Sequence, residues 1–263
     1  MYMKFLKKRI KQGEVVNGCW LNLGSALTAE IVGSAGFDWV LIDLEHGAGN
    51  EKDVLTQLQA LENSNTAAIV RIESGAKQRI HRVLDVGAEG VMCPHINNAK
   101  EAKEVVHGLR YPPHGGRGVA KMVRATGFGK NFLEYYNNSN ENIIGIVQIE
   151  TPGALEHLDA IASIDGVDVL FIGPADLTMA LGIFGQFDHP LFLDAVKATI
   201  HAAEKAGKVT GILITNPDDY NSFYNLGIRM IACGADATFV AEGSRTMAAK
   251  LAAKRSQQEK PVQ

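Results

Sequence analysis

Two acidic residues, Glu150 and Asp176, lie just beyond apolar runs that predict β-strands. The runs cover residues 143–149 and 169–172, and Thr151-Pro152 between them predicts a helix start by its cap and its first-position proline. Strand, helix and strand within about thirty residues form a βαβ unit with parallel strands. If these two strands are neighbours, ~5 Å apart, the two carboxylates face each other across a small gap. Such a pair repels unless a proton or a cation lies between them.

Other polar side chains fall at the carboxyl ends of predicted strands. Asp43, Glu45 and His46 follow the second strand, Arg71 ends the third, and Gln148 precedes Glu150 at the end of the fifth. In a barrel of parallel strands these ends meet at one mouth, where active sites lie. The mouth would then bring together a base (His46), a cation (Arg71), an amide (Gln148) and two carboxylates able to bind a metal (Glu150 and Asp176).

Each of these residues also has a purely structural interpretation. The alternatives are a loop His46 bonded to Asp43, an Arg71 ion pair with Glu73 or Glu45, Glu150 as an acid favouring the following helix, and Asp176 as a helix cap. Taken together these alternatives weaken, because four independent accidents would have to coincide on one rim.

Eight β-rich runs alternate with helical segments along the chain. The predicted strands are 16–23, 39–43, 67–71, 90–93, 143–149, 169–172, 210–214 and 230–233. The predicted helices are 26–35, 51–63, 76–86, 99–109, 152–163, 190–206, 217–226 and 241–255. Eight strands, each followed by a helix and apolar on both faces, predict a single (β/α)₈ TIM barrel over residues 1–255, with a polar tail at 256–263. An open doubly wound sheet is the alternative, because periodicity cannot show closure.

No glycine-rich dinucleotide fingerprint or P-loop follows any predicted strand, which removes the main reason to prefer the open sheet. We expect no organic cofactor. Asp38 and Asp168 precede their strands, which assigns them to the amino end of the barrel and to stability. The long connection near residues 110–140, rich in glycine, proline and cations, is typical of a functional loop or an interface. Five histidines receive no role: His95, His107, His157, His189 and His201.

Composition limits the partners and the compartment. A net charge of −3 over 263 residues disfavours nucleic acid and acidic membranes, because no basic excess neutralises phosphates. No apolar run approaches the ~20 residues of a membrane span, and the first residues lack the apolar core of a signal peptide. Cys19, Cys93 and Cys233 are odd in number and far apart, which favours reduced thiols in a cytoplasmic protein.

Four motifs, in order along the chain, resemble the HpcH/HpaI family of class II, metal-dependent pyruvate aldolases. This family includes 4-hydroxy-2-oxoheptanedioate aldolase and 2-dehydro-3-deoxyglucarate aldolase. The resemblance extends from Trp20 to about Leu251. The motifs are Asp43-Leu44-Glu45-His46-Gly47, Arg110-Tyr111-Pro112-Pro113 with Gly115, Arg117 and Gly118, Gln148-Ile149-Glu150-Thr151, and Gly173-Pro174-Ala175-Asp176-Leu177.

The resemblance implies cleavage of a 4-hydroxy-2-oxo acid to pyruvate and an aldehyde through a metal-stabilised pyruvate enolate. Glu150 and Asp176 would hold Mg²⁺, Mn²⁺ or Co²⁺, cations suited to oxygen ligands. Arg71 would share the charge on the 2-oxo oxygen. The implied substrate-binding residues are Gln148, Gly173, Pro174, Ala175, Trp20 and Leu213.

The resemblance also assigns proton transfer and assembly. His46 would be the general base for the C4 hydroxyl, with Asp43 orienting it, and Asp85 would reach a histidine of a neighbouring subunit. A homohexamer, a trimer of dimers with the last helix exchanged, is implied. The apolar stripe that suits this helix is Phe239, Val240, Met247 and Leu251. The chain departs from the residues usual in the family at Asn22, His114, Lys121 and residues 128–130, which we expect at the rim that meets the aldehyde part of the substrate.

Two other functions stay open. A citrate-lyase-β-like enzyme would act on a CoA thioester at a similar acidic site, and a non-catalytic member would bind a 2-oxo acid. A Schiff-base aldolase needs a buried lysine on a strand, whereas no predicted strand carries a lysine at its carboxyl end. Metal-dependent chemistry is therefore favoured.

Overall fold

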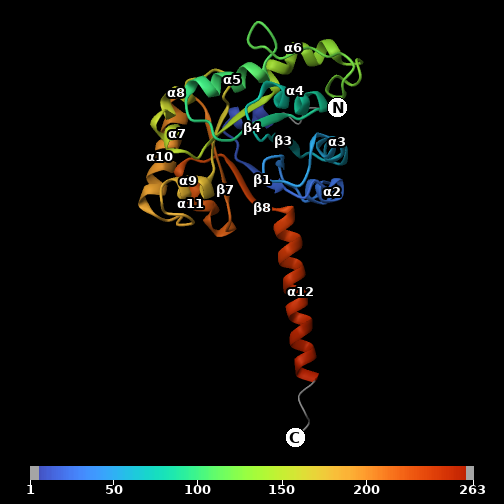
Figure 1. The fold of residues 1–263 in the computed structure, drawn as a ribbon, viewed down its shortest axis with the longest axis vertical. Helices are drawn as coiled ribbons and strands as arrows, with labels where there is room; N and C mark the ends of the chain where they lie inside the picture. The colour runs from blue at the N-terminus through green and yellow to red at the C-terminus, as the bar shows by residue number, and fades with distance from the viewer. Residues whose placement is uncertain (1–5, 259–263) are drawn as a thin grey trace.

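The computed structural model describes residues 6–258, in which eight parallel strands form a closed barrel (Figure 1). The strands pair in chain order, and β1 closes the barrel against β8. Their bounds are β1 Val16–Leu21, β2 Trp39–Asp43, β3 Ala67–Arg71, β4 Gly90–Cys93, β5 Ile144–Ile149, β6 Val169–Ile172, β7 Val209–Ile214 and β8 Met230–Ala235. The predicted (β/α)₈ barrel is confirmed, and closure rules out the open sheet.

Helices surround this barrel apart from α12, which extends away from it, and α1, α6 and α9 lie outside the eight predicted helices (Figure 1). Their bounds are α1 Leu6–Lys11, α2 Ala26–Ser34, α3 Glu51–Ala60, α4 Lys77–Val86, α5 Ala99–Leu109, α6 Phe132–Asn142, α7 Pro152–Glu156, α8 Leu158–Ala162, α9 Pro174–Ala180, α10 Pro190–Lys205, α11 Tyr220–Leu226 and α12 Asp236–Gln258; short 3₁₀ turns lie at η1 Arg124–Thr126 and η2 Pro217–Asp219. The single helix expected at 152–163 is wrong, because the backbone leaves helical geometry at His157 and divides it into α7 and α8.

An aromatic cluster fills the barrel interior. Trp39 packs edge-on against Trp20 and Phe171, with ring centroids 5.9 and 6.2 Å away. Two glycines make room for these rings: a Cβ on Gly18 would lie 2.2 Å from the Trp39 ring, and one on Gly211 would lie 2.4 Å from Phe171. The outward faces of the strands are also buried, under the helices. The strands are therefore apolar on both faces, as a barrel with an outer helical ring requires.

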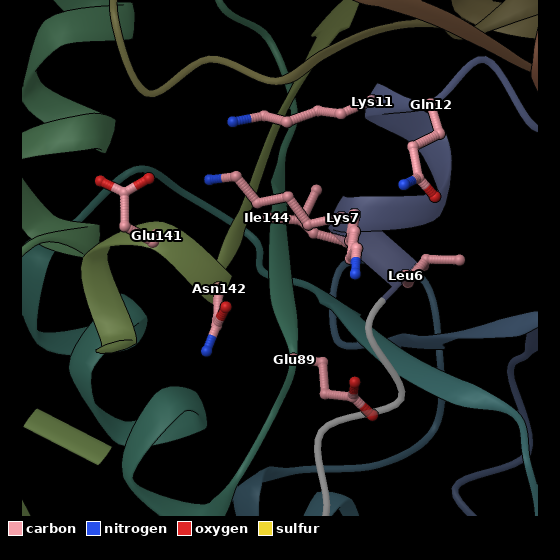
Figure 2. A pocket seen from close by; sticks show the side chains of 9 residues that line it. Leu6, Lys7, Lys11, Gln12, Glu89, Glu141, Asn142 and Ile144 are labelled. Atoms are coloured by element: carbon pink, nitrogen blue, oxygen red, sulfur yellow. The ribbon is translucent and has the colours of Figure 1, made fainter. Parts of the chain in front are cut away.

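Ion pairs with α1 brace the amino end of the barrel. Lys7 is buried, pairs with Asp168 at 2.9 Å and donates to the Ile143 carbonyl at 2.8 Å. Arg9 pairs with Asp38 at 2.7 Å. Both aspartates thus lie where the sequence placed them, and their partners come from a helix that it did not predict. A cavity of about 370 Å³ beside α1 also belongs to this end and not to the mouth (Figure 2).

The connection between α5 and α6 packs at the amino end of this barrel. It leaves the end of α5, and Arg124 donates to the carbonyls of Val86 and Leu58, near the ends of α4 and α3. The expectation that His114, Lys121 and residues 128–130 line the mouth is therefore wrong within one chain. The reason is topological: α5 runs back from the mouth, so the connection starts at the opposite end of the barrel.

Helix α12 leaves the barrel and projects away from it (Figure 1). Its apolar side chains Phe239, Val240, Met247 and Leu251 are 48–64% exposed. The helix includes residues 256–258 of the predicted polar tail, and the remainder of that tail lies outside the described residues. Across residues 6–258, none of the helices combines the length and the apolar content that crossing a membrane requires.

The three cysteines carry free thiols. Cys19 and Cys93 are buried in β1 and β4, and Cys233 is half-buried in β8. Burial raises the pKa of Cys19 to about 12 and also raises the pKa of Cys93. Both groups therefore stay protonated at neutral pH, as expected for structural thiols.

Replacing Lys7 by alanine tests the brace at the amino end. The Lys7→Ala variant leaves the Asp168 carboxylate buried without its cation, so we expect the free energy of unfolding to fall by about 3–5 kcal/mol. Urea unfolding measures the change. Lys8→Ala, one residue along and exposed, is the matched control and should change stability by less than about 0.5 kcal/mol. Equal losses in both variants would mean that the Lys7 ion pair does not brace the barrel.

Candidate active site

The Glu150 carboxylate is buried at the carboxyl end of β5. Strands β5 and β6 are parallel neighbours, and Glu150 is 2% exposed. Burial raises the pKa of Glu150, and the negative charges of Asp176 and Glu45 raise it further, while the N–H and the charge of His95 act in the opposite direction. Asp176, half-buried in the first turn of α9, is therefore close enough to interact with Glu150, as the βαβ unit predicted.

A glycine makes the space that Glu150 occupies. A Cβ on Gly173 would lie 2.3 Å from Glu150 Oε2, so no other residue fits there without moving the carboxylate. Gln148 Nε2 donates to the same oxygen at 2.8 Å, and the backbone N–H of His95 donates to Oε1 at 2.7 Å. Backbone and amide N–H groups thus hold the carboxylate, and within residues 6–258 it forms no ion pair with a lysine or an arginine.

Arg71 lies in the mouth between two acids. Its guanidinium binds both oxygens of Asp43, at 2.9 and 2.8 Å, and lies 2.9 Å from Glu45. It also donates to Gln148 at 3.4 Å. The alternative partner Glu73 is wrong, because that acid pairs with Arg79. A doubly held guanidinium is a preorganised donor for an oxygen that gains negative charge.

Asp43 is fully engaged without touching the His46 ring. Besides Arg71, its oxygens accept from Asn22 Nδ2 at 2.8 Å and from the backbone N–H groups of Glu45 and His46, at 3.0 and 3.4 Å. The His46 side chain is 67% exposed, and its Nε2 lies 4.0 Å from Glu45. Asp43 therefore orients the His46 backbone and Arg71, whereas the expectation that it orients the imidazole does not hold in this chain.

Asp85 lies away from the mouth of its own barrel. It is next to the last residue of α4, which runs toward the amino end, and it pairs with the buried Arg117 at 2.8 Å. The resemblance assigned Asp85 to a contact with a neighbouring subunit and placed Arg117 in a motif, and the structure joins the two residues within one chain. A contact of Asp85 with another subunit stays a prediction.

The remaining substrate-binding candidates line the mouth and its floor. Trp20 belongs to the interior cluster, with Arg71 Cζ 5.9 Å from its ring, and Leu213 is half-buried against the same cluster. Pro174 and Ala175 open α9, where first-turn N–H groups lack helical partners. The N–H of Gly173 donates to the Ile149 carbonyl at 3.4 Å. Their contact with a substrate stays a prediction.

Sequence reasoning missed His95. Its backbone has φ 54°, a left-handed conformation uncommon outside glycine,. The cost of such a conformation is ~1–3 kcal/mol, and such residues cluster at functional sites. The sequence did contain a signal for His95, because this residue follows the carboxyl end of β4 in the same way that His46 follows the carboxyl end of β2. Asn22, expected at the rim, does lie there and contacts Asp43.

The residues present fit a divalent cation. Glu150 and Asp176 offer carboxylate oxygens, the ligands that Mg²⁺ and Mn²⁺ prefer. Within residues 6–258 no cluster of three or more His, Cys, Asp or Glu side chains is arranged to hold a metal. Two carboxylates would therefore leave the other coordination positions to water and substrate, an open arrangement suited to catalysis.

Comparisons with known proteins agree with this architecture. The model of the HpcH/HpaI aldolase/citrate lyase family matches residues 17–242. A hydroxypyruvate/pyruvate aldolase from Roseobacter denitrificans is 38% identical over 93% of this chain and 95% of its own length. A 4-hydroxy-2-oxo-heptane-1,7-dioate aldolase from Salmonella arizonae is 38% identical over 95% of each chain. A crystal structure of a family protein from Burkholderia cenocepacia superposes with TM-score 0.89, at 34% identity, over 94% of this chain and 98% of that one.

The closed barrel of eight parallel strands defines a (β/α)₈ protein, a class whose active sites lie at the carboxyl ends of the strands,. The chain belongs to the HpcH/HpaI aldolase/citrate lyase family, and it is a lyase. The resemblance drawn from four motifs is thereby confirmed.

Removing either carboxylate tests the cation site. We expect Glu150→Gln and Asp176→Asn each to weaken Mn²⁺ binding by more than about 100-fold, because loss of a ligand exceeds the 10–100-fold effect of outer partners. Titration calorimetry measures the affinity. Glu73→Gln removes an acid at the same end that pairs with Arg79 and should bind Mn²⁺ normally. Unchanged affinity in both site variants would exclude the assignment.

Proposed function

We propose that the chain is a divalent-metal-dependent aldolase that reversibly cleaves a 4-hydroxy-2-oxo acid to pyruvate and an aldehyde. The observation that carries the proposal is the convergence of Glu150, Asp176 and Arg71 on one mouth. The aldolase names of relatives that match almost the whole chain support the same reaction. The proposed cofactor is Mg²⁺, Mn²⁺ or Co²⁺, with no organic group.

The chain's own residues bind and polarise the pyruvate half. Glu150 and Asp176 would hold the cation, which when bound supplies Lewis-acid polarisation of the 2-oxo group. Arg71, fixed by Asp43, donates to the 2-oxo oxygen as it gains negative charge. Gln148 orients Glu150, and the N–H of Ala175 faces the carboxylate of the substrate.

The proton on the C4 hydroxyl must leave as the bond between C3 and C4 breaks. His46 is the candidate base because its exposed imidazole lies at the mouth, and histidine is the side chain that enzymes use most often for general acid–base catalysis. Glu45 Oε2 lies 4.0 Å from its Nε2. The position of His46 at the edge of the mouth suits a proton transfer to or from solvent.

Pyruvate release tests the function. With a set of 4-hydroxy-2-oxo acids we expect pyruvate to form without CoA, to stop with EDTA and to recover with Mn²⁺. Coupled lactate dehydrogenase reports the product. Turnover that needs a CoA thioester would favour the citrate-lyase-like alternative, and no EDTA-sensitive turnover with any oxo acid would favour a non-catalytic binding protein.

Replacing His46 by alanine separates the base from the metal-dependent step. We expect aldol cleavage to slow by roughly 10²–10⁴, the usual contribution of a general base. Decarboxylation of oxaloacetate requires no hydroxyl base and should fall much less. Equal losses in the two reactions would show that His46 has a structural or binding role.

We also propose a homo-oligomer, a hexamer arranged as a trimer of dimers, in the cytoplasm. The support for assembly is α12, which carries four exposed apolar side chains and leaves the barrel (Figure 1). Other barrel helices bury an apolar face, so α12 would gain the same burial against a neighbouring subunit. The reduced thiols support the compartment.

Charges on α12 test its role in assembly. Met247→Glu and Leu251→Glu together should produce smaller particles by light scattering, because a buried unpaired carboxylate opposes association. Lys250→Glu changes an exposed polar residue on the same helix and should leave the mass unchanged. A full-size assembly in the double variant would show that this stripe is not an interface.

A further inference from the structure

His95 places a second imidazole at the mouth. Its ring lies between two acids, with Nδ1 3.5 Å from Glu150 Oε1 and Nε2 3.5 Å from Glu45 Oε1. The side chain is 60% exposed, so the ring faces the space through which a substrate enters. His46 lies on the other oxygen of Glu45, at 4.0 Å. Two exposed imidazoles therefore share one carboxylate at the mouth.

The backbone of His95 has a separate role from the ring. Its N–H holds Glu150, and its carbonyl accepts from Asn97 Nδ2 at 2.8 Å. Asn97 in turn accepts from Thr151 at 2.8 Å, which ties the loop after β4 to the start of α7. The left-handed backbone at φ 54° is thus anchored on both sides. The anchors fix where the ring projects without using the ring itself.

The ring retains hydrogen-bonding capacity. Its distances to Glu45 and Glu150 exceed those of ordinary hydrogen bonds, which centre near 2.9 Å. Arg71 holds the other oxygen of Glu45, Oε2, at 2.9 Å, and Oε1 faces the His95 ring. The ring makes only this long contact at Nε2, so an N–H there can donate to an oxygen of a bound molecule at normal hydrogen-bond distance.

The mouth is polar on the side of β2 to β4 and apolar on the side of β7. Glu45, His46 and His95 form the polar side, and Leu213 lies on the other. With pyruvate on Glu150 and Arg71, and C4 beside His46, the substituent on C4 extends along this polar side. A hydroxyl on that substituent would meet the His95 ring.

We propose that His95 is a specificity-determining residue, whose Nε2–H donates to a hydroxyl on the carbon next to the aldehyde carbonyl. The preferred acceptors are then α-hydroxyaldehydes, and simple alkyl aldehydes react more slowly. The inference rests on the proposed aldolase function and adds the class of aldehyde.

Two aldehydes of equal size test the preference. Glycolaldehyde and propanal differ by a hydroxyl in place of a methyl group, and each is condensed with pyruvate in the presence of Mn²⁺. We expect the wild-type enzyme to favour glycolaldehyde in kcat/KM by roughly 3–10-fold, the value of one neutral hydrogen bond. His95→Gly keeps the backbone N–H to Glu150 and accepts φ 54°, and it should lose this preference. The preference is a ratio of two kcat/KM values for one variant, so a general change in rate caused by the substitution cancels.

Two further variants separate the ring from loop mobility and from histidine loss in general. His95→Asn tolerates the left-handed backbone but withdraws the donor from the Nε2 position, so it should lose the preference like His95→Gly. His201→Asn, on the exposed surface of α10, should keep it.

The outcomes distinguish the two proposals. A wild-type enzyme without a preference, or a preference that survives in both His95 variants, would overturn the role of His95. A preference kept by His95→Asn and lost only with glycine would also overturn it, because loop mobility would then be the cause. A wild-type enzyme that releases no pyruvate from any oxo acid would instead refute the aldolase function.

Discussion

The structure depends on keeping the Glu150 carboxylate buried and still able to act on a ligand. A buried charge costs free energy unless donors or a cation compensate it. Gln148 and the N–H of His95 supply two hydrogen bonds, and Gly173 gives up its side chain to leave room. None of these neighbours neutralises the charge. The carboxylate is therefore held in place by groups from three strand ends, an arrangement consistent with the cation site proposed above.

Arg71 shows the opposite arrangement in the same mouth. Asp43 and Glu45 hold the guanidinium from two sides. Asn22 and two backbone N–H groups also donate hydrogen bonds to the Asp43 carboxylate. One charged group is held by neutral donors and the other by acids, so the mouth presents an anionic face beside a cationic donor. A 2-oxo acid would use both, because Glu150 and Asp176 would hold a cation and Arg71 would donate to a substrate oxygen.

The two ends of the barrel divide stability from chemistry. At the amino end, Lys7 and Asp168 satisfy each other, and the long connection packs beneath the strands. At the carboxyl end, His46 and His95 remain exposed and only loosely paired. This division follows from the parallel barrel, whose strand ends carry loops that can vary without disturbing the ring of helices. Helix α12 departs from that ring and leaves its apolar side chains exposed.

The sequence by itself determined the barrel and most of its site. The periodicity of apolar residues and the helix-capping residues located the strands, because these signals are local. The polar residues that follow the strands then put Glu150, Asp176, Arg71 and Gln148 at one mouth. It did not determine the partners of these groups. Only the tertiary structure decided that Asp43 holds Arg71 and leaves the His46 ring free, and that Asp85 faces Arg117. Only the structure brought His95 to Glu150 and Glu45, since residues 50 or more positions apart meet through the closure of the barrel, which periodicity does not encode.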